Sequence, residues 1–398
     1  MNRDSVIERV VSLRKLIRQH ENWRTEQTLN LVASENFASP EARRFLSTDL
    51  SNRYSARDHF YRGTRYTDEI ESMAIDVARD LYRAKFADVR PISGHTCSLI
   101  LYLSFLKSGN KVVTCPPKYG GYPGSSEVGL GGLLSLKNLH FPFDPKLMNI
   151  IPRETFSMLK SERPEMTIFG SSFIPFPYEV RRSVPTEYEG LVAYDGSHVM
   201  GLIAGRQFQD PLREGCSILM GSTHKSLFGP QGGLILSNDE QVFSVIDRSV
   251  HPGIVDNIHW NRVASLTYSM LELSRFGSKY ASQVVKNSKA LAKALYEIGV
   301  PVKCDSLGFT MSHQVLLDFD VVKSVEIADI LQSVDIITDV GIRLGTSEIT
   351  RRGMKEGEME TIAAIIADSF KPHMNREQTR RRVHSLTREF EGLEFTFR

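Results

Sequence analysis

Hydrophobic positions change their spacing along the chain, and these changes divide it into regions. Near the N-terminus, Val6, Val10, Leu13 and Ile17 recur at helical spacing, which predicts an amphipathic helix that packs through one face. Between about residues 70 and 310, short continuous apolar runs alternate with helical stretches. The runs expected to form strands are 111–114, 166–169, 191–194, 217–220 and 233–236.

Strands that are apolar at every position are typical of a sheet covered on both faces, and intervening helices favour parallel pairing. This region is therefore predicted to be an α/β domain with a mostly parallel sheet. Residues 259–298 have the pattern of one long helix, and shorter apolar runs follow at 315–317 and 336–337. We expect a helical arm at 1–28, a large domain at 29–270 and a small α+β domain at 271–398.

Composition narrows the classes of protein and partner. With 398 residues, 41% hydrophobic and 24% charged, the chain is expected to fold and not to be disordered. Its net charge of +2 argues against nucleic acid as a partner. No apolar run approaches the length of a membrane span, and the start lacks the apolar segment of a secretory signal. Four cysteines without paired spacing predict buried thiols in a cytoplasmic protein, and the histidines show no metal-ligand spacing.

Lys225 is the main candidate for a catalytic residue. It follows a predicted buried strand within Gly221-Ser222-Thr223-His224-Lys225, and a glycine-rich turn closes the segment. A desolvated lysine loses its charge and forms Schiff bases with carbonyl groups. A surface lysine in a polar turn is the alternative. Asp195 also ends a predicted strand, and the carboxyl ends of parallel strands line the ligand crevice.

Such a pair suits pyridoxal phosphate, which takes a lysine for its aldehyde and an acid for its ring nitrogen. Asp195 alone is equally well explained as a helix cap. Ser93-Gly94-His95 precedes a predicted helix, where free backbone N–H groups would hold a phosphate, although many helices begin in this way. Tyr122 follows a Gly-Gly turn and could stack on a flat ring, or simply pack against the core.

Taken together, these motifs resemble serine hydroxymethyltransferase, a pyridoxal-phosphate enzyme of the aspartate aminotransferase-like fold. The resemblance extends from about residue 29 to 368. The segments that carry it are Leu31-Val32-Ala33-Ser34-Glu35-Asn36, Ser51-Asn52-Arg53-Tyr54, Ser93-Gly94, Asp195 with His198, Thr223-His224-Lys225, Gly229-Pro230, Gly232-Gly233, Gly341-Ile342-Arg343-Leu344-Gly345-Thr346 and Thr350-Arg351-Arg352-Gly353.

The resemblance implies a large, mostly parallel seven-stranded sheet domain, a smaller C-terminal α+β domain and a homodimer with shared active sites. It implies the catalytic residues Lys225 for the Schiff base, Asp195 for the ring nitrogen, His198 beside a cofactor oxygen, and Tyr54 supplied by a neighbouring subunit. The cofactor-binding residues that it implies are Ser93, Gly94, His95, Tyr122, Ser172, Asp195, His198, Ser222, His224 and Lys225. Arg343, assisted by Ser34 and Tyr54, would bind the substrate carboxylate.

Departures from the family pattern bear on the substrate. No glutamate stands two residues beyond Tyr54, where Asp58 or His59 could substitute. Gln231 replaces an arginine, and Asp256-Asn257 replaces a glycine pair that reaches a neighbouring phosphate, so His251 or Arg262 would have to compensate. The loop that supplies an asparagine to the pterin is missing, because residues 334–340 run almost directly into Gly341.

These features favour an enzyme that cleaves or forms the Cα–Cβ bond of a β-hydroxy-α-amino acid, giving glycine and an aldehyde, without folate. It would act as an aldolase or transaldolase. A genuine serine hydroxymethyltransferase using tetrahydrofolate or another one-carbon pterin is the alternative. Another pyridoxal-phosphate reaction, or a non-catalytic binding protein, is less favoured, because Lys225, Asp195 and Arg343 are all present.

Overall fold

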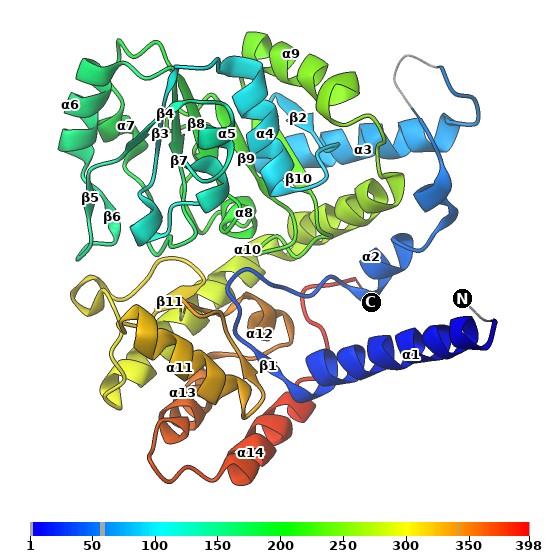
Figure 1. The fold of residues 1–398 in the computed structure, drawn as a ribbon, viewed down its shortest axis with the longest axis vertical. Coiled ribbons are helices and arrows are strands. Elements are labelled where there is room, and N and C mark those ends of the chain that lie inside the picture. Colours follow the sequence, from blue (N-terminus) through cyan, green and yellow to red (C-terminus); the bar gives the residue numbers. More distant parts are fainter. Residues whose placement is uncertain (1–2, 56–59, 342, 398) are drawn as a thin grey trace.

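The computed structural model describes residues 3–55, 60–341 and 343–397. Its larger body is built around a seven-stranded sheet (Figure 1). The strand order is β2 (Phe86–Asp88), β10 (Gly233–Ser237), β9 (Ile218–Ser222), β8 (Leu191–Asp195), β7 (Met166–Phe169), β3 (Lys111–Thr114) and β4 (Lys137–His140). β10 is antiparallel to both neighbours, and the other pairs are parallel. The predicted α/β class, mostly parallel sheet and five apolar strands are confirmed.

Alternate residues of each central strand serve two different cores. In β9, Leu219 faces one core, and Ile218 and Met220 face the other. One side is covered by α4 (Gly94–Phe105), and the opposite side by α3 (Arg65–Tyr82), α8 (Met200–Ala204) and the first part of α10 (Trp260–Glu297). Because both faces are covered, apolar residues are required at consecutive strand positions, and this produces the continuous runs in the sequence.

Shorter elements complete the larger body around this sheet. They are α2 (Pro40–Phe45), α5 (Leu130–Leu133), β5 (Phe143–Asp144), β6 (Asn149–Ile150), α6 (Pro152–Glu162), α7 (Val180–Ser183) and α9 (Glu240–Arg248).

The smaller body contains two two-stranded sheets. β1 (Leu29–Asn30) pairs in parallel with β12 (Ile336–Ile337), and β11 (Gln314–Leu316) pairs antiparallel with β13 (Arg343–Gly345). Its helices are α11 (Val321–Gln332), α12 (Ser347–Arg351), α13 (Glu356–Ser369) and α14 (Arg376–Glu389). Leu29 and Leu31 belong to this core, although they begin the predicted large domain. The partner strand β12 lies some 300 positions away in sequence, so no local sequence pattern indicates that β1 pairs with it.

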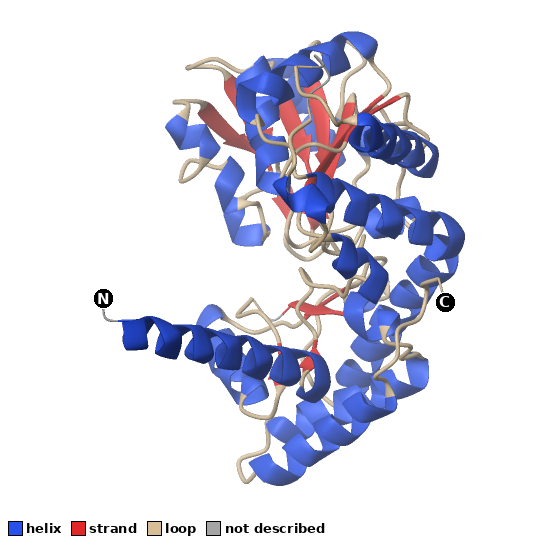
Figure 2. Ribbon diagram, turned by 90° about the vertical axis from the view of Figure 1, so that its right-hand side faces the viewer, coloured by secondary structure: helices blue, strands red, loops and turns tan. Residues whose placement is uncertain are grey.

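α10 joins the two bodies (Figure 1), which lie one above the other in Figure 2. It is 38 residues long, in agreement with the predicted helix at 259–298, and its two ends contribute to different cores. Gly205 permits close packing of α8 on it, since a Cβ there would lie 2.4 Å from the carbonyl oxygen of Gly277. The proposed domain boundary at 270 falls inside this continuous helix and stays a prediction.

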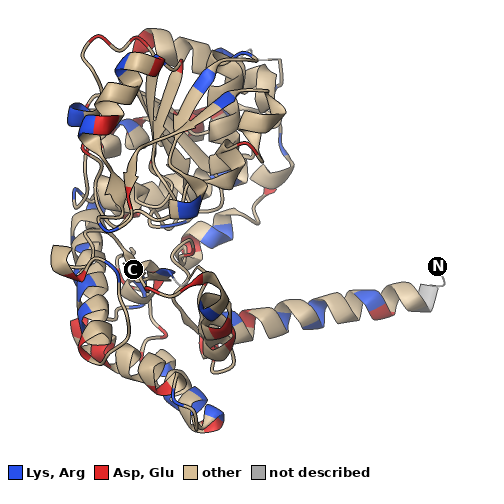
Figure 3. Ribbon diagram, turned by 60° about the vertical axis from the view of Figure 1, so that its left-hand side comes forward, with Lys and Arg blue, Asp and Glu red and all other residues tan. Residues whose placement is uncertain are grey.

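The N-terminal helix α1 (Arg3–Glu21) projects away from both bodies, with charged residues distributed along it (Figure 3). The predicted helix is confirmed, but its apolar positions do not pack within the chain. Val10, Leu13 and Ile17 are 42%, 59% and 50% exposed. Among the described residues, no helix combines the length and the apolar character needed to cross a bilayer.

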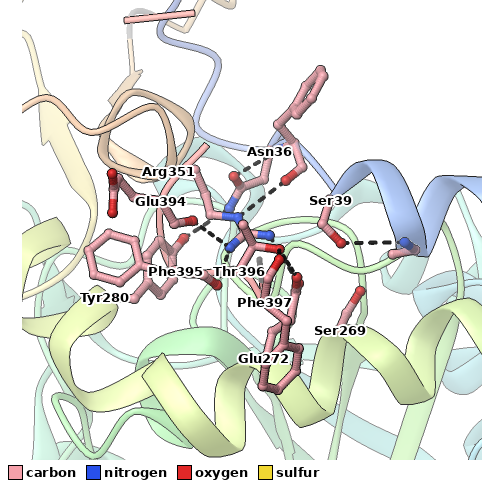
Figure 4. Close-up of polar contacts among 12 residues, drawn as sticks. Asn36, Ser39, Ser269, Glu272, Tyr280, Arg351, Glu394, Phe395, Thr396 and Phe397 are labelled. Carbon is pink, nitrogen blue, oxygen red and sulfur yellow. Dashed lines mark hydrogen bonds and ion pairs between the residues drawn. The ribbon is translucent and has the colours of Figure 1, made fainter. Parts of the chain in front are cut away.

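The C-terminal segment returns to the junction of the two bodies and is held there by Arg351 (Figure 4). The guanidinium donates to the carbonyl oxygens of Glu394 and Phe395, at 2.8 and 2.5 Å, and forms an ion pair with Glu272 of α10 at 3.0 Å. Both charged side chains are fully buried. Arg351 also lies over the ring of Phe228, 3.8 Å from its centroid, directly beside the turn that carries Lys225.

Replacing Glu272 with Gln leaves the buried Arg351 without its counter-charge. Because an uncompensated charge in a protein interior is costly, we expect the free energy of unfolding to fall by about 3–5 kcal/mol, measured by urea denaturation. Glu297→Gln is the matched control. It breaks an exposed i,i+4 pair with Lys293 on the same helix, and should change stability by less than about 0.5 kcal/mol. Equal effects of the two substitutions on stability would contradict the inference that Glu272 compensates the buried charge of Arg351.

Candidate active site

The site lies at the carboxyl ends of the parallel strands. β7, β8 and β9 run in the same direction, so the residues that follow them meet at one edge of the sheet. Ser172 follows β7, Asp195 ends β8, and Ser222 ends β9 three residues before Lys225. Together with residues from the start of α4 and from β13, they line a cavity of about 530 Å³.

The turn that carries Lys225 is fixed from several directions. Asn36 donates to the carbonyl oxygen of Lys225 at 2.9 Å, and Tyr280 donates to that of Ser226 at 3.1 Å. Thr223 is fully buried and its hydroxyl donates to Pro230 O at 2.6 Å. With its backbone held on both sides, the lysine side chain is directed into the cavity.

The Lys225 amine is desolvated. Burial lowers its pKa from 10.5 to about 8, Asp195 opposes this shift, and Arg343 adds to it. Nζ lies 3.3 Å from Nε2 of His198. Burial, and then the charge of Lys225, also lowers the pKa of His198 well below its usual value, so the imidazole is neutral. A neutral ring next to a lysine of low pKa provides the conditions in which the amine is a nucleophile.

Asp195 presents a carboxylate to the same cavity. Its Oδ1 accepts a hydrogen bond from the backbone N–H of Ser197 at 2.9 Å, which sets the side-chain rotamer. An anion at this position favours the protonated form of a ring nitrogen. Asp195 therefore lines the same cavity as Lys225, and its role toward a ring nitrogen stays a prediction.

The start of α4, beside Ser222, is the candidate phosphate cradle. Ser93 caps the helix by accepting from Thr96 N at 3.0 Å, while Gly94 packs directly against Ser222. A Cβ at position 94 would lie 2.2 Å from Ser222 Oγ, so only glycine allows this approach. His95 follows and its Nδ1 lies 3.3 Å from the hydroxyl of Tyr122. The helix start, with its unpaired N–H groups, suits a phosphate.

Arg343 enters from the smaller body at the start of β13. Its Nε and Nη2 lie 3.0 and 2.9 Å from Oδ2 of Asp339, and Nη1 donates to the carbonyl oxygen of Ser172. The guanidinium plane is therefore held by both bodies before any substrate binds. Asp339 belongs to the short connection between β12 and β13, where the pterin loop was predicted to be missing.

Every predicted site residue except Tyr54 lines this cavity. Tyr54 is 54% exposed and packs against Tyr61, with ring centroids 5.2 Å apart. This placement agrees with the prediction that Tyr54 serves a neighbouring subunit, which stays a prediction, as do the individual roles of the other residues. Asp58 and His59, considered as substitutes for the missing glutamate, lie outside the described residues.

Sequence reasoning left several cavity-lining residues without a role. They are Glu35, Ser171, Ser197 and Gln231. Ser171 and Ser197 carry a usable signal, because each lies within two residues of the end of a parallel strand. Arg262, considered as a compensating cation, is buried, and its Nε and Nη1 have no partner among the described residues. The Arg262 side chain packs against Gly232. A Cβ at position 232 would lie 2.7 Å from Nη1 of Arg262.

Comparisons with known proteins agree with this geometry. The serine hydroxymethyltransferase family model matches residues 9–366. Serine hydroxymethyltransferase of Methanocaldococcus jannaschii is 40% identical, over 96% of this chain and 94% of its own. That of Archaeoglobus fulgidus is 38% identical, over 93% and 89%. The crystal structure of L-threonine transaldolase from Pseudomonas fluorescens, in its internal aldimine state, superposes with a TM-score of 0.91 at 26% identity, covering 99% of this chain and 95% of that one.

Pyridoxal phosphate is the cofactor, and the described residues fit it. The cavity holds an amine of lowered pKa, a carboxylate and a glycine-lined helix start. These three groups match the aldehyde, ring nitrogen and phosphate of the cofactor. The described residues contain no group of three or more His, Cys, Asp or Glu arranged to hold a metal ion.

Substituting Gly94 with Ala should weaken binding of pyridoxal phosphate by at least about tenfold, because the new methyl group displaces Ser222 from the phosphate cradle. Equilibrium titration of the apoprotein measures the affinity. Gly357→Ala provides the control, since a Cβ there meets nothing within 4 Å, and it should bind normally. Unchanged affinity in Gly94→Ala would place the phosphate elsewhere.

The rate at which apoprotein and pyridoxal phosphate form the Schiff base should rise with pH and level off above about pH 8, the pKa of Lys225. Below that pH the amine carries a proton and has no lone pair with which to attack. Nα-acetyl-lysine in the same buffers corrects for titration of the cofactor itself. A protein profile that follows the free amine up to its usual pKa of 10.5 would show that Lys225 is not desolvated.

Proposed function

The chain belongs to the serine hydroxymethyltransferase family, and we propose that it cleaves and forms the Cα–Cβ bond of a β-hydroxy-α-amino acid. We further propose that it does so without requiring a pterin. The family and the transaldolase neighbour make it a pyridoxal-phosphate enzyme of Cα–Cβ bond chemistry. The observation that carries the finer proposal is the pairing of Arg343 with Asp339. The short loop that would otherwise reach a pterin instead orients the residue for the substrate carboxylate.

Each group has a task that follows from its position. Arg343 binds the amino-acid carboxylate through its remaining N–H groups and thereby orients the Cα–Cβ bond. Bound pyridoxal phosphate supplies an electron sink for the pair released when that bond breaks, and Asp195 keeps the ring nitrogen protonated. The β-hydroxyl must lose a proton as the aldehyde leaves. His224 lines the cavity, and burial lowers its pKa to about 4, so its neutral ring is our candidate acceptor.

Transfer of a one-carbon unit to a pterin is the second candidate, and the relatives favour it. Those from archaea that match at 38–40% identity are named serine hydroxymethyltransferase. The same cleavage would begin this reaction, with the released formaldehyde unit captured by tetrahydrofolate or another one-carbon pterin. The two candidates differ only in whether the carrier is needed.

Cleavage of serine and of threonine should proceed equally fast with and without tetrahydrofolate, because the loop that would supply an asparagine to the pterin is missing. The measurement is glycine formation under both conditions, with an acceptor aldehyde tested alongside for transaldolase activity. A known folate-dependent family member serves as the positive control. Rapid conversion of serine that depends on tetrahydrofolate would establish the second candidate and exclude the first.

The same proposal includes a homodimer, and the exposed apolar face of α1 supports it. A monomer rarely exposes so many apolar residues on one element. The exposed apolar side chains of this helix are Val6, Ile7, Val10, Val11, Leu13, Leu16 and Ile17. We propose that a second copy of the chain covers this face and that Tyr54 then reaches the partner's cavity.

Mixing the two inactive variants Lys225→Ala and Tyr54→Phe should restore about a quarter of the wild-type activity, because half of the random dimers would contain one site with both native residues. Subunits are exchanged by mild denaturation and refolding, and each variant refolded alone is the control. Sedimentation of the wild type should give twice the 44.9 kDa chain mass, and Leu13→Asp should lower it. If the mixture stays inactive, Tyr54 does not act across an interface.

A further inference from the structure

The side-chain amide of Gln314 has an orientation that its neighbours determine. Gln314 lies in β11 and is fully buried. Its Oε1 accepts from the backbone N–H of Ile174 at 2.8 Å, and its Nε2 donates to the carbonyl oxygen of Ser172 at 3.0 Å. If the amide were flipped, its NH₂ group would face the N–H of Ile174 and its oxygen would face the carbonyl oxygen of Ser172, so neither hydrogen bond could form. The assignment of oxygen and nitrogen is therefore unambiguous.

This orientation determines which nitrogen of His198 carries the proton. The second hydrogen on Nε2 of Gln314 is directed at Nδ1 of His198, 3.2 Å away. An amide NH₂ group only donates, so Nδ1 must present a lone pair. A neutral imidazole has a single N–H, which then stands on Nε2. The hydrogen bond to Gln314 thus selects one tautomer of a buried ring.

The proton on Nε2 in turn constrains Lys225. Nε2 of His198 faces Nζ at 3.3 Å, and an N–H needs a lone pair to receive it. An ammonium group has three hydrogens and no lone pair, whereas a neutral amine has one. We propose that Gln314 is a positioning residue, which fixes the tautomer of His198 and thereby favours the unprotonated amine of Lys225 for linkage to the cofactor.

The other charged and titratable groups near these hydrogen bonds do not change the tautomer expected for His198. Asp195 raises the pKa of Lys225 and Arg343 lowers it. His313 stacks on His198 with centroids 5.9 Å apart, and donates through its own Nε2 to Ala33 O at 3.0 Å. Burial lowers the pKa of His313 to about 3 and that of His224 to about 4, so both rings are neutral.

The linkage itself shows why the lone pair matters. The neutral amine adds to the aldehyde carbon of pyridoxal phosphate, and the two amine hydrogens leave with the aldehyde oxygen as water. An ammonium has no lone pair and must first release a proton.

The tautomer can be read directly from the nitrogen resonances of the apoprotein, labelled with ¹⁵N-histidine. The signals of His198 are identified by their loss in His198→Phe. We expect Nδ1 to have the shift of an unprotonated nitrogen and Nε2 that of a protonated one. The reverse pattern, or a doubly protonated ring at neutral pH, would overturn the proposal without any variant of Gln314 having to fold.

The consequence for Lys225 is tested with Gln314→Met, which keeps the volume and removes the donor. The midpoint of the pH profile for Schiff-base formation should move upward by about one unit, because a bare Nε2 can then accept from the ammonium. In a His198→Phe background the same substitution should move nothing. A midpoint that stays unchanged in the native background contradicts the proposal.

Gln209→Met is the matched control. Gln209 is a buried glutamine whose Oε1 accepts from Tyr178 N at 2.8 Å and whose Nε2 donates to Tyr178 O at 3.0 Å, and it does not line the cavity that contains Lys225. Its replacement should lower thermal stability but leave the pH midpoint in place. If both variants shift the midpoint alike, a general loss of packing is the cause. None of these readouts involves turnover, so they are independent of which substrate the enzyme uses.

Discussion

The lowered pKa of the Lys225 amine, which lets the side chain lose its proton near pH 8, is the constraint on which this structure depends. Water strongly favours the ammonium, so the chain must shield Lys225 from much of the solvent and offer the side chain partners that suit a lone pair. Burial does the first, and His198 does the second. The backbone contacts of Asn36 and Tyr280 keep the turn rigid enough for both to persist.

The two bodies of the molecule contribute different parts of this environment. The parallel sheet brings Asp195 and Lys225 to one edge, as the geometry of strand ends requires. The smaller body supplies Arg343 from β13 and Gln314 from β11, and both contact Ser172 of the larger body. The site therefore exists only when the bodies are joined correctly. α10 and the buried pair of Glu272 and Arg351 stabilise that junction.

Much of this arrangement could be predicted from the sequence, for identifiable reasons. Strands buried on both faces leave continuous apolar runs, and a polar residue directly after such a run marks the functional edge of the sheet, as at Asp195. The roles of Gln314 and Asp339 could not be predicted, because each depends on a contact or loop geometry that no local pattern encodes. The pairing of β1 with β12 was missed for the same reason. The exposed face of α1 has the apolar periodicity of a buried face, and periodicity alone does not show what packs against it.

The most direct test of the account is chemical trapping of the cofactor linkage. Holoprotein is reduced with borohydride, digested and analysed by mass spectrometry, which locates the pyridoxyl group on the chain. The account predicts the label on Lys225, with the other lysines unmodified. A label on another lysine, or one spread over several surface lysines, would contradict the desolvated amine of Lys225 as the centre of the chemistry.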